Sequence, residues 1–465
     1  MERLEHNGIL VIEPPQPLGL SIVVRNKEIL LSQLQEEMAV AWVRKLGTTY
    51  VDDPVFVKNF MMDFSKALRI TPELDVDEVD FSEVIQVVEE ERTVKENMSS
   101  EEKKLAREER KIERERLKEK YGYATVDGEH MELGNYQTEP SGIFMGRGEH
   151  PLRGRWKQGA TQKDITLNIH PDAAQHLEGD WGELVWAPET MWVAKWTDEL
   201  TGKVKYIWLH DSTPIKQERE AAKFDKALRV EQRIEEIREH ITEGLQSEKL
   251  PRRMVAAACY LIDNLSLRVG DEKDPEEADT VGATTLRAEH LTFKNGLVIF
   301  DFLGKDSVPW HKEIELPTEV YNVLEELHNN ALERIESFKR RSSRKTGADP
   351  KKIAQIFPSI RSTHVNKFLS EVYPELTAKV FRTYHATVVM REELKTSKAK
   401  KIDLEFIKKA AFKRANLEVA RVMNHTKQAP KGWNRSANRF KERIKKADIR
   451  IEKAKAQLKE KQRRR

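Results

Sequence analysis

Cysteine is nearly absent from this sequence, whose 465 residues include a single one, Cys259. One cysteine cannot form an intramolecular disulfide, so the chain has no disulfide framework and fits a reducing compartment. Cys259 lies in the apolar run 254–267, where a small hydrophobic side chain is expected to fill the buried face of a helix. We therefore do not expect it to act as a nucleophile or a ligand.

Long apolar runs and cofactor motifs are also lacking. No stretch approaches the roughly 20 apolar residues of a membrane-spanning helix, and residues 1–6 lack the apolar core of a secretory signal. The 13 histidines are scattered without metal-ligand spacing, and no complete phosphate-binding loop occurs. We expect no metal, no ATP, no other cofactor and no membrane partner.

The acidic cluster 271–279 does not match a calcium loop and is expected to be a solvated loop.

Positive charge is concentrated at one end of the chain. Residues 431–465 contain 15 basic and 4 acidic residues, although the whole chain carries a net charge of only +3. Apolar residues recur within this stretch at spacings of four and three, which is typical of a coiled-coil seam. They are Trp433, Ala437, Phe440, Ile444, Ala447, Ile451, Ala454 and Leu458. Such a seam needs a partner helix; the alternative is a basic helix that uses the stripe to dimerise or to lie on DNA.

The sequence patterns predict a multidomain α+β protein. Residues 1–211 mix short apolar runs with prolines and glycines, which predicts an N-terminal mixed α/β lobe with a helix near residues 30–45. Acid and base alternate densely over residues 89–120, which predicts solvated connector helices with a capping box at 99–102. Residues 212–428 are expected to form a mainly α-helical domain with one β-hairpin region, and residues 429–465 a single helix.

Four side chains in the helical domain fall at the ends of predicted elements. Arg268 ends an apolar helix, Lys305 lies on a hairpin tip, Arg382 begins a helix, and His425 ends one. Taken singly, each fits a helix-end cation or a solvated turn residue. Together they suit phosphoryl transfer, because arginines can hold the non-bridging oxygens, a histidine can donate a further hydrogen bond, and a lysine can protonate a leaving 5′-oxygen. Such a set needs no metal.

Longer motifs surround these four residues. They are Leu267-Arg-Val-Gly-Asp-Glu-Lys273, Ala278-Asp-Thr-Val-Gly282, Phe300-Asp-Phe-Leu-Gly-Lys-Asp-Ser307, Leu376-Thr-Ala-Lys-Val-Phe-Arg-Thr-Tyr384 and Asn424-His425. In this order they resemble the active-site motifs of eukaryotic-type type IB DNA topoisomerases. The segment Phe144-Met-Gly-Arg-Gly-Glu-His-Pro151 is similar to the family's DNA-contacting loop, and essentially the whole chain is matched.

The resemblance implies a DNA clamp with a tyrosine-recombinase-like catalytic domain and double-stranded DNA as its partner. Such an enzyme relaxes positive and negative supercoils by cleaving one strand through a 3′-phosphotyrosyl intermediate and resealing it, without ATP or metal. Arg268, Arg382 and His425 would stabilise the pentacoordinate phosphate, and Lys305 would be the general acid. The resemblance also implies DNA-binding residues, which are Arg147, His150, Lys157, Lys273, Thr280 and, beside the cleaved site, Asp306.

The family's tyrosine nucleophile is not found in this sequence. It belongs near the C-terminus, after a coiled-coil linker, whereas no tyrosine follows Tyr384, which the resemblance places in the pocket wall. Residues 429–465 would then be the first linker helix, truncated. Either a missing C-terminal segment or a separate small subunit would bring the return helix and the tyrosine. The absence of the long charged N-terminal tail of nuclear members suggests an archaeal enzyme of the cytoplasm or nucleoid, or else a trimmed eukaryotic enzyme of the nucleus.

Two other functional classes stay open. Tyrosine site-specific recombinases share the Arg, Lys, Arg, His set, but they usually place a histidine three residues before the second arginine, where this chain has Lys379. A non-catalytic DNA-binding clamp is the third class, although retention of all four pocket residues argues against it.

The isolated 465-residue chain should bind duplex DNA but should not relax supercoiled plasmid, because it has no nucleophile. Its affinity should fall steeply with salt, since phosphate contacts dominate the binding of such clamps. Gel-based relaxation and binding assays on the same preparation measure both properties. Efficient relaxation by the chain alone would refute the expectation that the nucleophile is missing.

Overall fold

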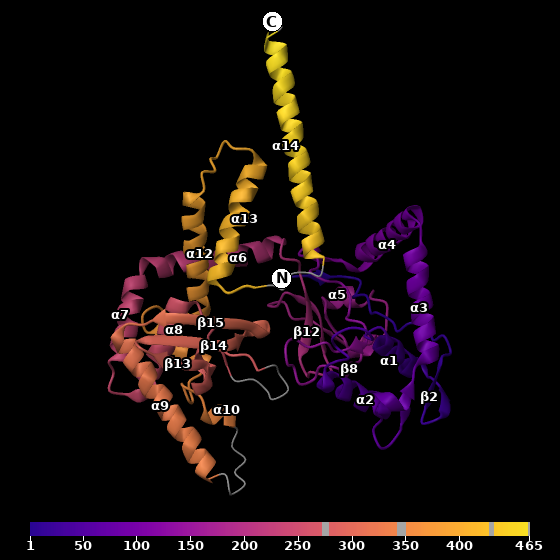
Figure 1. The fold of residues 1–465 in the computed structure, drawn as a ribbon, viewed down its shortest axis with the longest axis horizontal. Helices are drawn as coiled ribbons and strands as arrows, with labels where there is room; N and C mark the ends of the chain where they lie inside the picture. Colours follow the sequence, from indigo (N-terminus) through magenta and orange to yellow (C-terminus); the bar gives the residue numbers. More distant parts are fainter. Residues whose placement is uncertain (272–278, 342–349, 427–431, 464–465) are drawn as a thin grey trace. The chain divides into compact units, whose positions relative to one another are not determined.

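The structure is a computed structural model that describes residues 1–271, 279–341, 350–426 and 432–463 (Figure 1). The chain divides into two compact units, Met1–Val388 and Val389–Arg465. This division coincides with neither of the boundaries expected near residues 211 and 428, so the predicted domain limits stay predictions. In the described residues, no helix is long and apolar enough to cross a membrane.

A first hydrophobic core near the N-terminus is built on stacked aromatic rings. Trp42 and Phe60 stack with their ring centroids 4.6 Å apart, and Phe64 follows at 5.5 Å from Phe60. A three-stranded sheet of order β3-β2-β4 and three helices enclose this core. These elements are β2 (Ser21–Val24), β3 (Lys27–Leu30), α1 (Gln33–Val43), α2 (Pro54–Leu68), β4 (Val79–Asp80) and α3 (Ser82–Asn97).

The helix expected near residues 30–45 begins later than predicted. Leu30 ends strand β3, where it pairs with Ser21 of β2. Ser32 then caps α1 in a capping box with Gln35, so the helix begins at Gln33. The capping signal therefore prevails over the apolar pattern that runs through Leu30 and Leu31.

A second N-terminal core lies between small sheets. One sheet has the order β1-β5-β6 and another the order β10-β9-β11-β12, in which only the β9–β10 pair is parallel. The elements of this region are β1 (Leu4–Glu5), β5 (Tyr123–Val126), β6 (Glu129–Glu132), β9 (Thr166–Asn168), α5 (Pro171–Ala174), β10 (Glu183–Val185), β11 (Trp192–Thr197) and β12 (Val204–Trp208). Strands β7 (Gly142–Ile143) and β8 (Trp156–Lys157) pair with each other, and their Ile143 and Trp156 pack against the first core instead. The chain's first strand thus pairs with a strand some 120 residues later, since Leu4 faces Val126. That pairing closes the core.

The charged connector predicted over residues 89–120 is confirmed as helical. Figure 1 shows α3 and α4 (Ser100–Tyr121) projecting as a pair from the N-terminal part of the chain. Ser99 caps α4 by accepting a hydrogen bond from the amide of Glu102, as the capping box predicted. None of the residues of α4 is buried, so this helix is bathed in solvent.

The main core belongs to the helical part of the first unit. Helix α8 (Leu250–Leu265) passes through its centre with Ala256, Ala257, Ala258 and Cys259 fully buried. Burial raises the pKa of the Cys259 thiol, in keeping with its expected role as a core residue. The surrounding helices are α6 (Pro214–Gln232), α7 (Ile234–Leu245), α9 (Thr318–Arg341), α10 (Pro350–Ile353), α11 (Ser362–Ser370) and α12 (Ala378–Thr396).

The predicted β-hairpin region is a three-stranded antiparallel sheet packed against these helices. Strands β13 (Leu291–Lys294), β14 (Leu297–Gly304) and β15 (Val308–Glu315) follow one another in chain order. Val298, Phe300, Phe302 and Trp310 face the helical core. The long β14–β15 pairing is continuous from Leu297 opposite Glu315 to Gly304 opposite Val308, so the turn that follows Gly304 stands at the end of a stiff ribbon.

The second unit contains two long helices beyond α12. They are α13 (Glu405–Val422) and α14 (Trp433–Arg463), which agrees with the helices expected from the sequence. Five apolar side chains of the predicted seam are each more than half exposed on α14, namely Trp433, Phe440, Ile444, Ile451 and Leu458. The helix is therefore amphipathic, and its pairing in a coiled coil stays a prediction.

His6 makes the second N-terminal core sensitive to acid. Its Nδ1 accepts a hydrogen bond from the amide of Gly8, and its Nε2 donates to the carbonyl oxygen of Asn168 at 2.9 Å. Burial lowers the pKa of His6 to about 4. The folded protein therefore holds this ring neutral at pH values where an unfolded chain would protonate it.

Lowering the pH from about 6.5 towards 4 should reduce the free energy of unfolding, because only the unfolded chain takes up the proton of His6 in this range. The loss from His6 should be at most about 3 kcal/mol. Urea unfolding at several pH values measures it, and His6→Asn should flatten the pH dependence. Replacement of the exposed His311 by Asn is the control and should leave the slope unchanged. An unchanged slope in His6→Asn would contradict the assignment.

Candidate active site

Three separate segments of the first unit are joined by main-chain hydrogen bonds around the predicted pocket. The amides of Ala283 and Thr284 donate to the carbonyl oxygens of Arg268 and Val269, each at 2.8 Å. The amide of Val281 donates to the carbonyl oxygen of Leu303, also at 2.8 Å. The segment that follows α8, the loop through Thr280 and the end of β14 are thereby held side by side.

Two glycines allow this close approach. Gly270 has a φ of +79°, and a Cβ added to it would lie 2.8 Å from the Cα of Gly282. A Cβ added to Gly282 would lie 2.6 Å from the Cα of Gly270. Because real Cβ atoms do not approach backbone so closely, both positions require glycine for the segments to meet.

The joined segments and the start of α12 line an open pocket of about 420 Å³. Arg268, Lys305 and Arg382 line it, so three of the four residues expected to carry the chemistry are brought together. Among the described residues of the lining, Lys379 supplies a fourth basic side chain and Asp271 a carboxylate. The described lining therefore carries more positive than negative side chains.

Arg382 shows how strongly positive this pocket is. Burial, and then the nearby charge of Arg268, lower the pKa of Arg382 to about 10. The guanidinium remains protonated at neutral pH, so the two like charges repel each other across the pocket. A Nη1 hydrogen bond to the carbonyl oxygen of Ser266 holds Arg382 in place. A bound phosphate would relieve this repulsion.

Lys305 lies at the hairpin tip, as predicted. It begins the short turn Lys305–Ser307 between β14 and β15. The next two residues, Asp306 and Ser307, have φ values of +65° and +57°, a left-handed conformation that is uncommon outside glycine. The tight turn places Lys305 in the pocket lining while Asp306 is free to meet another segment.

That segment is the loop of residues 144–151, which contains Gly146 and Gly148 and which the sequence analysis compared with the family's DNA-contacting loop. Arg147 forms an ion pair with Asp306, and the Ser307 hydroxyl lies 3.4 Å from the Arg147 carbonyl oxygen. A Cβ on Gly148, whose φ is +57°, would lie 2.5 Å from the Ser307 Oγ. Two residues predicted to contact DNA are thus in contact with each other.

The other predicted DNA-binding residues have varied surroundings. Thr280 lines the pocket. The His150 ring packs edge-on against Phe144 and accepts from the amide of Leu152. Lys273 lies outside the described residues. The DNA contacts of these residues stay predictions.

Lys157 is engaged inside the protein. Its ammonium bonds to Glu139 and lies 2.7 Å from Oδ2 of Asp198, whose side chain is 1% exposed. Burial disfavours the charge of Lys157, but these carboxylates outweigh burial and raise its pKa. A DNA phosphate would therefore have to compete with two carboxylates for this lysine.

His425 lies just past the end of α13, in the second unit. Its amide donates to the carbonyl oxygen of Ala420 at 2.8 Å, and Asn424 before it has a φ of +53°. The backbone therefore turns sharply at this point. Because the residue belongs to the second unit, its role at the phosphate stays a prediction.

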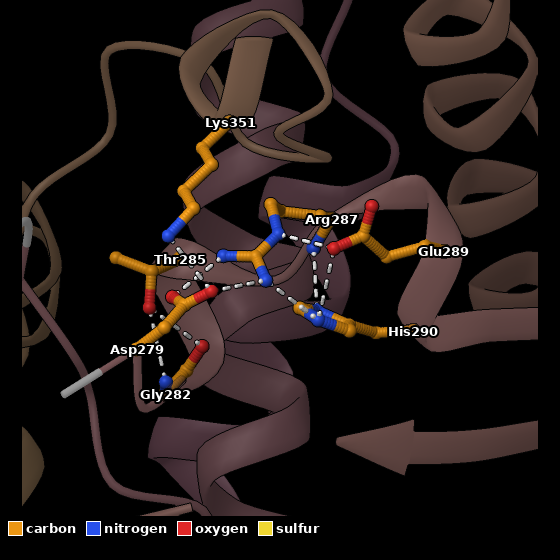
Figure 2. A network of polar contacts seen from close by, with 7 residues as sticks. All are labelled: Asp279, Gly282, Thr285, Arg287, Glu289, His290 and Lys351. Carbon is orange, nitrogen blue, oxygen red and sulfur yellow. Dashed lines mark hydrogen bonds and ion pairs between the residues drawn. The ribbon is translucent and has the colours of Figure 1, made fainter. Parts of the chain in front are cut away.

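A polar network that the sequence analysis missed fixes the loop ahead of Thr280. Figure 2 shows Arg287 facing Asp279 with two parallel hydrogen bonds, both 3.0 Å long. Glu289 bonds to Nε of Arg287 at 2.7 Å, and Lys351 reaches Asp279 at 3.1 Å. The network clamps one end of a pocket-lining segment.

The two described ends of segment 271–279 are exposed loop residues, as expected, but both of their carboxylates have partners that the sequence did not indicate. Asp279 is held by Arg287 and Lys351, and Oδ1 of Asp271 accepts a hydrogen bond from the amide of Ser362. Residues 272–278 lie outside the described residues. The sequence signal was the short spacing between Asp279 and Arg287, which does not by itself reveal that the chain folds back between them.

Comparison with known proteins agrees with this geometry. Residues 1–209 match the family model described as eukaryotic DNA topoisomerase I, DNA binding fragment, and residues 212–458 match eukaryotic DNA topoisomerase I, catalytic core. The chain belongs to the eukaryotic DNA topoisomerase I family. The topoisomerase resemblance stated from the motifs is thereby confirmed.

Individual topoisomerases match nearly the whole chain. DNA topoisomerase 1 of Candida albicans is 35% identical over 459 residues, which are 96% of this chain and 56% of the yeast protein. DNA topoisomerase I, mitochondrial, of Homo sapiens is 31% identical over 474 residues, covering 98% of this chain and 74% of the human protein. The chain thus spans little more than half the length of the yeast relative. These relatives are eukaryotic and give the expected archaeal source no support.

Inorganic phosphate should stabilise the protein through the pocket arginines. At a phosphate concentration tenfold above the Kd, the gain in stability should be about 1.4 kcal/mol, seen as a rise in melting temperature. Arg382→Gln should lose this gain, whereas replacement of the exposed Arg340 by Gln should keep it. The general salting-out effect of phosphate is common to all three proteins and cancels in the comparison. An equal rise in Arg382→Gln would rule out the pocket as the anion site.

Proposed function

We propose that this chain forms the DNA-binding and charge-stabilising part of a type IB DNA topoisomerase. The enzyme would relax positive and negative supercoils of double-stranded DNA by cleaving and resealing one strand, with no need for ATP or a metal ion. The observation that carries the proposal is the convergence of Arg268, Lys305 and Arg382 on one pocket. The attacking tyrosine would come from a C-terminal segment or a small subunit that the 465 residues do not contain.

The chemistry follows from where charge appears during cleavage. The tyrosine oxygen bonds to phosphorus as the bond from phosphorus to the 5′-oxygen breaks, and negative charge grows on the non-bridging oxygens. Arg268 and Arg382 offset that charge, with His425 as a further donor. Lys305 gives its proton to the departing 5′-oxygen. The 3′-phosphotyrosyl bond stores the energy that reseals the strand when the 5′-hydroxyl attacks in return.

The remaining parts of the chain would grip the duplex. Residues 1–211 would form one lobe of a clamp and residues 212–428 the catalytic domain, with the tyrosine-recombinase fold. Arg147, His150, Lys157, Lys273 and Thr280 would contact DNA, and Asp306 would lie beside the cleaved site. Residues 429–465 would form the first helix of a coiled-coil linker, supported by the apolar residues exposed along α14.

The alternative functions are less well supported. A site-specific recombinase does not account for a chain that matches the topoisomerase I family over residues 1–209 and 212–458, and a non-catalytic clamp does not account for the basic residues that converge on the pocket. The cellular compartment follows from neither the fold nor the site. The family match is compatible with a nuclear enzyme, but the name of the human relative places that protein in mitochondria.

Addition of a tyrosine-bearing segment should restore DNA cleavage. The C-terminal part of the Candida albicans relative, added in trans or fused, is a suitable source. With this segment, Lys305→Ala should slow cleavage about 10²- to 10⁴-fold, because the 5′-oxygen then leaves without a proton. Cleavage is measured in a single turnover on duplex DNA.

A matched lysine and an altered substrate sharpen this test. Lys294 is exposed beside the other turn of the same sheet, and Lys294→Ala should cleave at the wild-type rate. A substrate with sulfur in place of the 5′-oxygen needs no proton donor and should rescue Lys305→Ala. Failure of every combination to cleave would overturn the proposed function, and failure of the sulfur substrate to rescue would remove Lys305 from the general-acid role.

A further inference from the structure

Two contacts, one helical turn apart, join α12 to α8 behind the pocket. Arg382 donates to the carbonyl oxygen of Ser266, the residue that ends α8. Nε2 of His385 lies 2.9 Å from Oδ1 of Asp263 within α8. Since residues three apart lie on one face of a helix, Arg382 and His385 both face α8. Arg382 lines the pocket, whereas Ser266, His385 and Asp263 are not among the described residues that line it.

Asp263 is a carboxylate inside the main hydrophobic core. Its side chain is 1% exposed, and Cys259, Leu261 and Ile262 beside it on α8 are fully buried. A carboxylate in such a place is tolerated only when its oxygens receive hydrogen bonds. Its presence therefore requires donors at fixed positions.

Two donors reach Asp263 from two other helices. His385 of α12 serves Oδ1, and Nε of Arg238 on α7 serves Oδ2 at 2.9 Å. Burial acts against the charge of Asp263, but these two hydrogen bonds outweigh it, so the pKa of Asp263 lies below its usual value. Because a carboxylate can only accept, Nε2 of His385 must carry a hydrogen. The three side chains tie α7, α8 and α12 at one point.

This tie matters for Arg382 because that residue carries its charge in a half-buried place. Burial, and then the nearby charge of Arg268, lower the pKa of Arg382. Ala378, Phe381 and Tyr384 pack α12 into the main core, and a polar contact one turn after Arg382 adds a fixed point to this packing. His385 provides that contact from the turn after Arg382, where its ring also packs beside Tyr384.

We propose that the His385–Asp263 pair, braced by Arg238, is a positioning device that holds α12 in the rotation at which Arg382 meets the scissile phosphate. His385 and Asp263 are not among the described residues that line the pocket, so they act through Arg382. The proposal rests on the proposed function of the pocket. It names three residues to which the sequence motifs assigned no role.

The first test uses the chain alone and inorganic phosphate. His385→Leu removes the donor at similar bulk, and His385→Gln places an amide N–H near the position of Nε2. The apparent Kd for phosphate, taken from melting temperatures, should rise about tenfold in His385→Leu and stay near the wild-type value in His385→Gln. A simple loss of packing would affect both variants alike, so rescue by glutamine identifies the hydrogen bond.

A matched control comes from an exposed pair of the same kind. His311 lies 3.6 Å from Asp301, and their side chains are 58% and 74% exposed. His311→Leu should bind phosphate as the wild type does. If His385→Leu does not fold, as judged by its urea midpoint, His385→Ala removes the same donor without added bulk and takes its place.

The second test adds the tyrosine-bearing segment and measures single-turnover cleavage at saturating DNA. His385→Leu should cleave about 100-fold more slowly, with its Kd for DNA within threefold of the wild-type value, and His385→Gln should restore the rate. Wild-type phosphate binding in His385→Leu, or equal losses in His385→Leu and His385→Gln, would overturn the positioning role. If even the wild-type mixture fails to cleave, the proposed function fails, and the phosphate measurement still decides the proposal.

Discussion

The charge of Arg382, half-buried and beside the exposed Arg268, is the constraint on which the rest of the pocket depends. A charge in such a place is tolerated only if other groups hold it there. Main-chain hydrogen bonds from Ala283 and Thr284 fix the segment that carries Arg268. The carbonyl oxygen of Ser266 takes a hydrogen from Arg382. The pocket is thus kept ready for a phosphate before DNA arrives, and little reorganisation remains when charge develops on that phosphate.

Several contacts hold the segments around these two arginines together. Gly270 and Gly282 meet at a distance that no side chain allows. Asp279 receives a two-pronged hydrogen bond from Arg287 and a contact from Lys351. The three-stranded sheet carries Lys305 at the end of a continuous ribbon. Each feature fixes a different wall of one small cavity.

The sequence predicted those parts of the site that depend on local pattern. Lys305 was placed on a hairpin tip because alternating apolar residues and a turn flank it, and Arg268 because an apolar helix ends beside it. The placement of Lys305 holds in the structure, whereas α8 already ends at Leu265, so Arg268 lies just past the helix. The family motifs then supplied what spacing could not, namely which of many arginines belong together.

The sequence could not predict contacts that depend on the path of the chain in space. Asp263 and His385 are 122 residues apart, and neither stands in a pattern that marks it as polar core. Lys157 was expected to face DNA, but its partner Asp198 comes from the neighbouring sheet. The helix was predicted to start near residue 30, but α1 begins at Gln33. The apolar residues Leu30 and Leu31 lie at the end of strand β3 and just after it, and the cap at Ser32 separates them from the helix.

The internal ion pair of Lys157 bears on how affinity for DNA should be counted. A surface lysine that binds a phosphate frees a condensed cation from the duplex and gains entropy. Lys157 is already paired with the carboxylates of Asp198 and Glu139. If it bound a DNA phosphate, it would leave these carboxylates, and the buried charge of Asp198 would lose its partner. Such a residue adds little to the strength of the grip. It can instead favour the one register of the duplex at which that exchange is complete.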